Sequence, residues 1–194
     1  MPTKICYIDT ETTGLFAYKN GIIQIAGAIE IDGVIKKTFN LRCAPFPTDE
    51  IEPRALEVNG TSLEEVRLYP DPKKVFEELT NILGSFCDKF SKTDKYFLVG
   101  YNIKFDEDFL RKWWTKCGDK YFGSWFWTPS IDVMTLAAHH LRDQRAELPN
   151  FKLGTVAAGL GLTSSEGAGL HDASTDIDYT IQIYKLCEAH TKRD

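Results

Sequence analysis

The pattern of apolar and polar positions along the chain predicts several short strands. A short apolar run over Ile5–Asp9 is typical of a buried strand. Two β-rich runs, Ile22–Ile31 and Val34–Arg42, are joined by Asp32-Gly33. Because Asp-Gly is a preferred pair in two-residue turns, these runs predict a β-hairpin. Later apolar runs predict further strands at Tyr96–Gly100 and Trp125–Thr128.

Apolar residues recur at helical spacing elsewhere in the chain. After a proline-containing loop at 45–53, the clearest helix begins at Asp71-Pro72, since Asp caps a helix start and Pro suits the first turn. The same periodicity predicts helices from about Phe105, over Ile131–Leu141, over Leu153–Leu160, and in a final segment that turns Ile177, Ile181 and Tyr184 inward. A hairpin followed by strands that alternate with helices predicts an α/β fold, in which helices cover a mixed sheet.

Length and composition restrict the class of protein. A chain of 194 residues, with 43% hydrophobic and 26% charged residues, fits one globular domain, which we expect to span 1–194 with its core at about 4–188. There is no run of 18 apolar residues and no visible secretory signal, so we expect a cytoplasmic protein without a membrane segment. The five cysteines contain no C-x-x-C pair, which disfavours a disulfide framework and a zinc ribbon.

The charge balance limits how the chain can bind a polyanion. It has 28 acidic and 23 basic residues, a formal net charge of −5, which excludes a bulk basic field. A nucleic acid would therefore have to be held by local bases, backbone donors or bound cations.

Four carboxylates fall at the ends of predicted buried elements. Asp9 and Glu11 lie two apart at the end of the first strand, where period two puts them on one side. Asp106 lies near the start of the helix after a central strand, and Asp176 lies one turn inside the final helix. His171 precedes that helix, beside a glycine-containing loop at Ser164–Gly169 that we expect to be flexible. Each residue alone is also explained as an ordinary cap, turn or packing residue.

The combination favours a site for divalent cations. Buried carboxylates that converge repel one another and would have to become protonated unless cations neutralise them. Oxygen ligands suit Mg²⁺ or Mn²⁺ rather than zinc. Two such ions about 4 Å apart can stabilise the attacking and leaving oxygens of a phosphoryl displacement.

Three segments resemble the exonuclease motifs of the DEDD superfamily, histidine subclass. They are YIDTETTGL at 7–15, YNIKFDEDFL at 101–110 and HDASTD at 171–176. That family includes the proofreading subunits of replicative DNA polymerases and related ribonucleases. The resemblance implies an RNase H-like fold, a mixed five-stranded sheet flanked by helices. It also implies a 3′→5′ exonuclease that releases nucleoside 5′-monophosphates from single-stranded or frayed DNA.

The resemblance also implies roles for individual residues. Two Mg²⁺ or Mn²⁺ ions would be held by four ligands: Asp9, Glu11, Asp106 and Asp176. His171 would be the general base that takes a proton from the attacking water. The pocket for the terminal nucleotide would be formed by Thr12, Thr13, Gly14 and Leu15. Asn102 would orient the strand or support Asp106. One departure from many relatives is Asn59-Gly60-Thr61, where they have a histidine-glycine pair.

Other interpretations stay open at this stage. The nearest alternative is a 3′→5′ exoribonuclease, because selectivity for the 2′-hydroxyl cannot be read from the sequence. A catalytically idle nucleic-acid-binding module and a structural calcium site are more remote. The partners implied are DNA or RNA 3′ ends and a polymerase or another replication or repair protein. Because the chain stops about 18 residues after Asp176, we expect a stand-alone nuclease or a module of a larger protein rather than a tail-tethered subunit.

Aromatic residues outside the motifs are interpreted mainly as core. The cluster at 121–127 is expected to pack beside the sheet, with Tyr121 and Phe122 as its most exposed pair. Leu15 is expected to contact the terminal base, whereas Phe16 is as well explained by packing.

Overall fold

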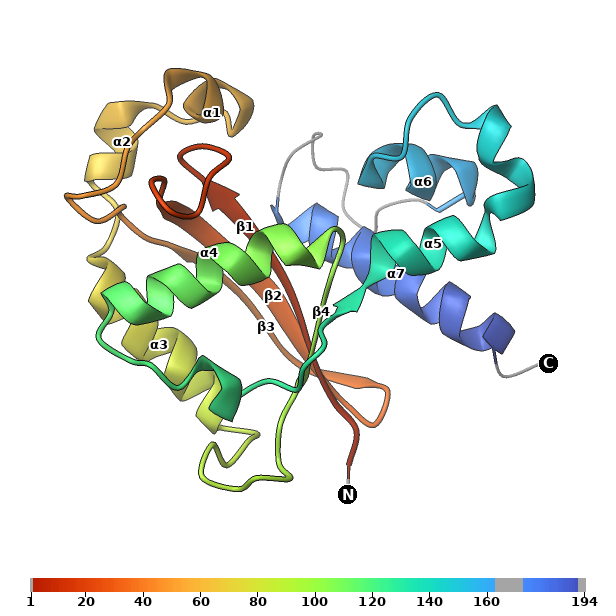
Figure 1. The fold of residues 1–194 in the computed structure, drawn as a ribbon, viewed down its shortest axis with the longest axis horizontal. Coiled ribbons are helices and arrows are strands. Elements are labelled where there is room, and N and C mark those ends of the chain that lie inside the picture. Colours follow the sequence, from red (N-terminus) through yellow and green to blue (C-terminus); the bar gives the residue numbers. More distant parts are fainter. Residues whose placement is uncertain (1, 163–172, 192–194) are drawn as a thin grey trace.

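The computed structural model describes residues 2–162 and 173–191. Figure 1 shows a central sheet with helices on both sides. In chain order its elements are β1 (Lys4–Thr12), β2 (Ile22–Ile31), β3 (Val34–Arg42), α1 (Pro53–Val58), α2 (Leu63–Arg67), α3 (Pro72–Gly84), β4 (Phe97–Gly100), α4 (Ile103–Lys116), η1 (Phe122–Ser124), β5 (Ile131–Asp132), α5 (Val133–His140), η2 (Arg142–Glu147), α6 (Leu153–Gly159) and α7 (Ala173–Thr191). Within the described ranges, none of these helices has both the length and the apolar character that crossing a bilayer requires.

The sheet is mixed, as the sequence predicts. Its strand order within the described residues is β3-β2-β1-β4-β5. β1 pairs antiparallel with β2 and parallel with β4, and β5 continues the parallel half. Both turn residues of the predicted hairpin, Asp32 and Gly33, have positive φ angles of 48° and 82°. That geometry is characteristic of the hairpin turn that Asp-Gly favours.

Two hydrophobic cores fill the two faces of the sheet. Alternation along β1 sends Cys6 and Ile8 to the core beneath α3 and α4. It sends Ile5 and Tyr7 to the opposite core, which α5, α6 and α7 cover. Since β1 is the middle strand of the five in the described sheet, its C-terminal end lies between helices that arrive from both faces.

The strand expected over Trp125–Thr128 is wrong. Trp125 and Phe126 are buried among other aromatic rings, and Phe126 forms only an isolated bridge with Tyr96. The fifth strand is instead Ile131–Asp132, which pairs with the end of β4.

Three other expectations need correction. The predicted helix over Ile131–Leu141 begins at Val133, because the side chain of Asp132 accepts a hydrogen bond from the N–H of Met134 and caps the helix. Phe122 is buried and only Tyr121, 71% exposed, lies at the surface of the aromatic cluster. The short helices α1 and α2, which follow the proline-containing loop, are absent from the prediction.

Candidate active site

The C-terminal end of β1 carries two carboxylates on one side of the strand. Asp9 and Glu11 are half-buried, and they alternate with the buried Thr10 and Thr12. Because successive residues of a strand point to opposite faces, both acids lie on the face covered by α5, α6 and α7. Thr10 therefore faces the side of α4.

Two further acids reach this end of β1 from helices on opposite faces of the sheet. Asp106 lies in the first turn of α4, and Asp176 lies in the first turn of α7. Desolvation raises the pKa of Asp9 well above its ordinary value, and the charges of Asp106, Glu11 and Asp176 raise it further. The other three carboxylates therefore lie near enough to Asp9 for their charges to act on it. The fold thus brings together the four carboxylates that the sequence singled out.

Asp106 is held by a residue that the sequence analysis missed. It is only 3% exposed, and its Oδ1 accepts hydrogen bonds from the backbone N–H of Thr10 at 2.9 Å and from Thr10 Oγ1 at 2.7 Å. Burial raises the pKa of Asp106 to about 7, while the two Thr10 hydrogen bonds act to lower it. The signal in the sequence was the hydroxyl residue between Asp9 and Glu11, pointing to the opposite face.

A fifth acid, Asp132, supports the start of α4. Its Oδ1 accepts a hydrogen bond from the N–H of Asn102 at 3.0 Å, and its charge contributes to the raised pKa of Asp106. Asn102 adopts a left-handed conformation, with φ 59° and ψ 41°, at the position that caps α4. Asn102 is therefore part of the turn that delivers Asp106. The signal for Asp132 was an Asp directly before a helical pattern.

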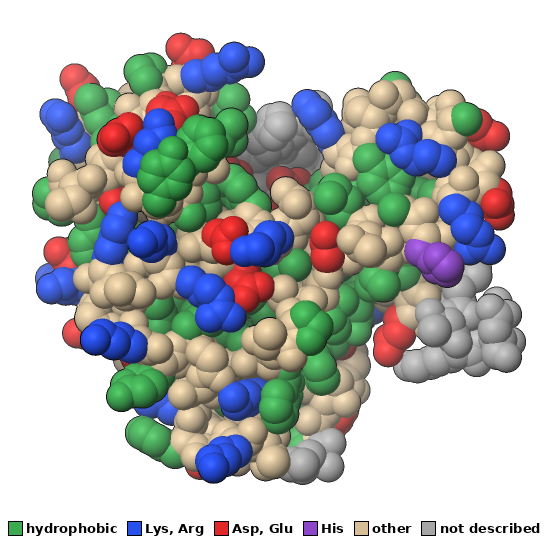
Figure 2. Space-filling view, viewed as in Figure 1, with side chains coloured by type: hydrophobic (Ala, Val, Ile, Leu, Met, Phe, Trp, Pro, Cys, Tyr) green, Lys and Arg blue, Asp and Glu red, His purple; other side chains and the backbone are tan. Residues whose placement is uncertain are grey.

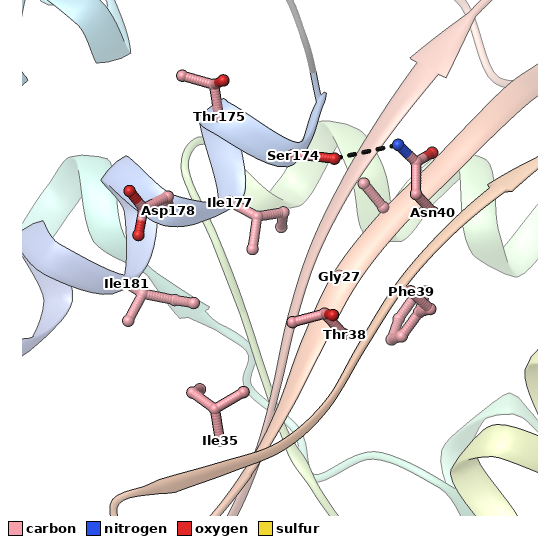
Figure 3. Close-up of a pocket in the computed structure, with 11 residues that line it drawn as sticks. Gly27, Ile35, Thr38, Phe39, Asn40, Ser174, Thr175, Ile177, Asp178 and Ile181 are labelled. Carbon is pink, nitrogen blue, oxygen red and sulfur yellow. Dashed lines mark hydrogen bonds between the residues drawn. The ribbon is translucent and has the colours of Figure 1, made fainter. Parts of the chain in front are cut away.

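The start of α7 is tied to the edge strand β3. Asn40 Nδ2 donates a hydrogen bond to Ser174 Oγ at 3.1 Å, as the dashed line in Figure 3 shows. Ile177 packs on the core beneath the helix, beside a cavity of about 470 Å³ between α7 and the hairpin. These contacts fix the first turn of α7, on which Asp176 lies.

The loop after β1 is held by a buried polar network. Asn20 is 1% exposed; its Oδ1 accepts a hydrogen bond from the N–H of Phe16 at 3.0 Å, and its Nδ2 donates to the carbonyl of Glu50 at 3.1 Å. Thr13 Oγ1 donates to the same carbonyl at 2.6 Å. Asn59, from the segment that departs from many relatives, donates to the carbonyl of Thr12 at 2.9 Å. The backbone over Thr12–Leu15 is therefore fixed from two sides.

Exposed apolar side chains of this loop line a groove against α4. Leu15 and Tyr18 are each 71% exposed, and Phe16 is 48% exposed. Together with Phe105 and Lys112 they border a cavity of about 540 Å³. Phe105 directly precedes Asp106 in the first turn of α4, so the groove and the site share that turn.

The surface of the molecule has a hollow that contains acidic side chains. Figure 2 shows this hollow between the body around α1 and α4 and the lobe formed by α5 and α6, with acidic side chains at its floor. In residues 2–162 and 173–191, no three His, Cys, Asp or Glu side chains are grouped as tightly as the ligands of a formed metal site. His171 lies outside the described residues.

The donor set nevertheless fits hard divalent cations. Asp9, Glu11, Asp106 and Asp176 offer only carboxylate oxygens, the ligands that Mg²⁺ and Mn²⁺ prefer. Burial, and after it the charges of the neighbouring acids, raise the pKa of Asp9, and a bound cation would favour its charged form.

A family model described as an exonuclease (RNase_T) matches residues 6–184. That range includes all three motifs and the whole described sheet except the first two residues of β1. The chain belongs to this exonuclease family. The resemblance to the DEDD superfamily and the assignment as an exonuclease are thereby confirmed.

Solved exonucleases share the fold of this family member. Escherichia coli Exonuclease I, in a complex with a dT13 oligonucleotide, is 20% identical with a TM-score of 0.75, and the match covers 98% of this chain and 42% of that one. A moderately thermophilic Exonuclease I from Methylocaldum szegediense is 19% identical with a TM-score of 0.73, covering 98% and 41%. The expected RNase H-like architecture is confirmed, and the chain spans less than half the length of these exonucleases. No curated protein matches the sequence.

Proposed function

We propose that this chain is a 3′→5′ exonuclease that removes nucleoside 5′-monophosphates from single-stranded or frayed DNA ends. The observation that carries the proposal is the placement of carboxylates at one end of β1: Asp9 and Glu11 lie on the strand, and Thr10 holds Asp106 of α4 beside them with two hydrogen bonds. A cluster of carboxylates in a surface hollow destabilises the protein unless it serves to bind cations. Hydrolysis of a phosphodiester is a reaction that uses such cations.

The four carboxylates would hold two divalent ions, Mg²⁺ or Mn²⁺. When bound, such ions supply positive charge to the attacking and leaving oxygens of the phosphodiester. Thr10 fixes the Asp106 carboxylate with two hydrogen bonds, which limits its rotation and favours its charged form. His171, close to Asp176 in the sequence, would take the proton from the attacking water, a task suited to an imidazole that is neutral near pH 7.

The loop after β1 would receive the terminal nucleotide. Leu15 presents an exposed apolar side chain, and Phe105 lines the same groove. Stacking of a base on such side chains is typically worth about 1–3 kcal/mol. The backbone of Thr12–Gly14, fixed by the network around Asn20, would hold the sugar and phosphate in register with the carboxylates.

The test is an end-shortening assay on 5′-labelled DNA with the wild type, Asp9→Asn and His171→Gln. Wild type with Mg²⁺ or Mn²⁺ should give a ladder that shortens one nucleotide at a time, and chelator should stop it. Both variants should lose at least about 100-fold in rate. Asp143→Asn is the matched control, because Asp143 is an exposed acid on η2.

Matched RNA and DNA oligonucleotides decide the substrate in the same assay. Faster shortening of RNA would replace the DNA assignment with the exoribonuclease alternative. Internal cuts, or activity that survives chelation, would refute the proposed reaction. Full activity of Asp9→Asn or His171→Gln would refute the residue assignment.

A further inference from the structure

A second pocket, distant from the carboxylates, combines lysines with exposed aromatic rings. We call it the distal pocket; it has a volume of about 440 Å³ and is lined by Lys89, Phe90, Lys92, Lys95 and Tyr121 together with two serines. Phe90 is 86% exposed and Tyr121 is 71% exposed. None of its lining residues is acidic, although the chain as a whole carries a net charge of −5.

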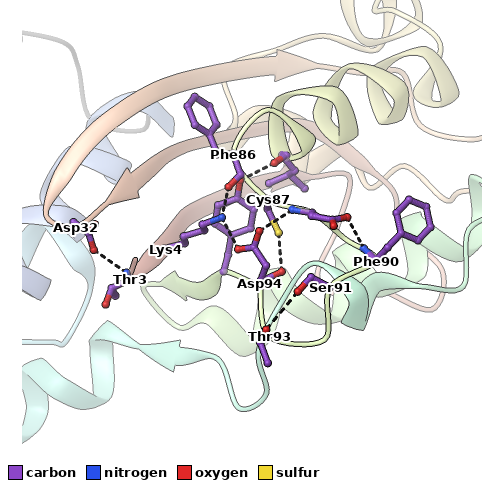
Figure 4. Close-up of polar contacts among 12 residues, drawn as sticks. Thr3, Lys4, Asp32, Phe86, Cys87, Phe90, Ser91, Thr93 and Asp94 are labelled. Carbon is purple, nitrogen blue, oxygen red and sulfur yellow. Dashed lines mark hydrogen bonds and ion pairs between the residues drawn. The ribbon is translucent and has the colours of Figure 1, made fainter. Parts of the chain in front are cut away.

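The loop that carries Phe90 is held in place by hydrogen bonds and an ion pair. The N–H of Asp88 donates to Asp94 Oδ2 at 3.0 Å, and the N–H of Phe90 donates to Asp88 Oδ1 at 3.0 Å. Lys4, in β1, forms an ion pair with Asp94 and donates to the carbonyl of Phe86. Figure 4 shows these contacts converging on Asp94, with the Phe90 ring pointing away from them.

The two acids of this loop are engaged within it. The charge of Asp94 is engaged by Lys4, and Asp88 caps the turn of its own loop. Lys89 Nζ lies 5.5 Å from the ring centroids of both Phe90 and Trp125. Lys95 Nζ lies 5.3 Å from the Trp127 ring centroid and donates a hydrogen bond to the carbonyl of Gly123 at 2.6 Å. A preformed surface with surplus positive charge and exposed ring faces suits a flexible polyanion that carries flat, stackable groups.

The distance between the distal pocket and the carboxylates suits one continuous strand. Lys4, at one end of β1, contacts Asp94 of the segment that carries the distal pocket, and Glu11 marks the carboxylate end. The seven residue steps from Lys4 to Glu11 span about 23 Å at about 3.3 Å per residue. At about 3.4 Å per stacked nucleotide, a strand crosses that distance in roughly seven nucleotides.

We propose that the distal pocket binds the nucleic acid strand on the 5′ side of the end that lies at the carboxylates. The inference rests on the proposed function, since it takes the same strand as its ligand. α4 connects the two places: Asp106 lies in its first turn, and the chain passes from its last residue, Lys116, to Tyr121. Nucleic acid is favoured over an acidic peptide because the exposed rings of Phe90 and Tyr121 offer faces on which any base can stack.

The test compares binding of short and long strands in a background that cannot degrade them. The Asp9→Asn protein is titrated into labelled DNA strands of about 3 and about 20 nucleotides. The Kd for each strand is measured by fluorescence anisotropy at several salt concentrations. The distal variant adds Lys89→Gln, Lys92→Gln and Tyr121→Ala. The control adds Lys36→Gln and Lys37→Gln, which remove two exposed lysines from β3.

The distal variant should bind the long strand roughly tenfold more weakly, and the short strand as before. Its salt slope for the long strand should fall by about two, one for each lysine removed. The control should keep the difference in Kd between the two strand lengths that the Asp9→Asn protein shows. Melting temperatures of all variants establish that each one folds.

Three outcomes would overturn the proposal. They are an unchanged Kd for the long strand, equal weakening for both lengths, and loss of binding to an acidic phenylalanine-containing peptide without loss of DNA binding. The outcome is separate from that of the proposed function. If the wild type shortens no DNA but the distal variant still binds only the long strand more weakly, the exonuclease proposal is contradicted. The proposal for the distal pocket is then still supported.

Discussion

Thr10 donates two hydrogen bonds to one oxygen of Asp106, from its backbone N–H at 2.9 Å and from its hydroxyl at 2.7 Å. The two residues are 96 positions apart in the chain. The pair therefore links the end of β1 to the first turn of α4, and it sets the rotamer of a buried carboxylate before any ligand binds.

Thr10→Val removes the hydroxyl and keeps the size of the side chain and the backbone donor. A buried hydrogen bond to a charged group is worth about 1.5–3 kcal/mol, so we expect the exonuclease rate to fall roughly 10- to 100-fold. Thr10→Ser should restore most of that rate because it restores the donor. Single-turnover rates on labelled DNA measure both effects. Equal rates for Thr10→Val and Thr10→Ser would show that the Thr10 hydroxyl does not contribute to the reaction.

Divalent cations should stabilise the protein against heat. If the four acids bind Mg²⁺ or Mn²⁺, a concentration of about 100 times Kd adds about 2.7 kcal/mol, which corresponds to a rise in Tm of roughly 5–10 °C. Asp9→Asn should lose most of this rise, and Asp143→Asn should keep it. Differential scanning fluorimetry with cation or with chelator measures the shift. A Tm that is indifferent to both cations in the wild type would contradict the ligand assignment.

Gly14 lies where the loop after β1 passes the buried Asn20 side chain. A Cβ added at Gly14 would lie 2.4 Å from Asn20 Nδ2, so Gly14→Ala must displace the network that holds the loop. We expect a loss of about 1–3 kcal/mol in the free energy of unfolding and a raised KM for DNA. Gly123→Ala is the matched control, since its added Cβ meets no heavy atom within 4 Å. Urea denaturation and steady-state kinetics would detect the difference.

The Asp94 carboxylate should make stability depend on pH. The N–H of Asp88 and then the ammonium group of Lys4 lower the pKa of Asp94 below its ordinary value. A lowered pKa in the folded state adds stability above the unfolded-state pKa, about 4, and that stability is lost as the pH falls through the folded-state pKa. Asp94→Asn should therefore be less stable than the wild type at pH 7, and the gap should narrow as the pH falls below about 4. Urea denaturation at both pH values measures the gap, and one that stays constant would count against this linkage.

The sequence predicts the parts of the fold that have a regular period. The hairpin over Ile22–Arg42 and the helix from Pro72 carry strong local signals, namely Asp-Gly at the turn and Asp-Pro at the helix start. β5 has two residues, which is too short to produce a pattern, and the aromatic run at Trp125–Thr128 was mistaken for it. The capping box of α2, Ser62 with Glu65, was the available signal for a short helix.

Some residues of the candidate site could be predicted from the sequence, and others could not. Its carboxylates can be singled out because they occur in combination, at the ends of several buried elements and within recognisable motifs, although each acid alone is ordinary at such a position. Thr10 and Asp132 act through contacts that join distant segments, and a single sequence does not reveal such pairings. The exposure of the Phe90 ring could not be predicted from the sequence either, because Phe90 continues the helical spacing of apolar residues from the preceding helix.

Asp176 lies on α7, the last helix of the chain, whereas Asp9 and Glu11 lie on its first strand. During synthesis the early acids leave the ribosome long before the final one, and the cluster stays incomplete until α7 docks against β1 and β2. A chain that lacks this helix would lack Asp176 and the contacts of α7 with β1 and β2. The order of elements thereby makes assembly of the carboxylate cluster a late event in folding of this domain.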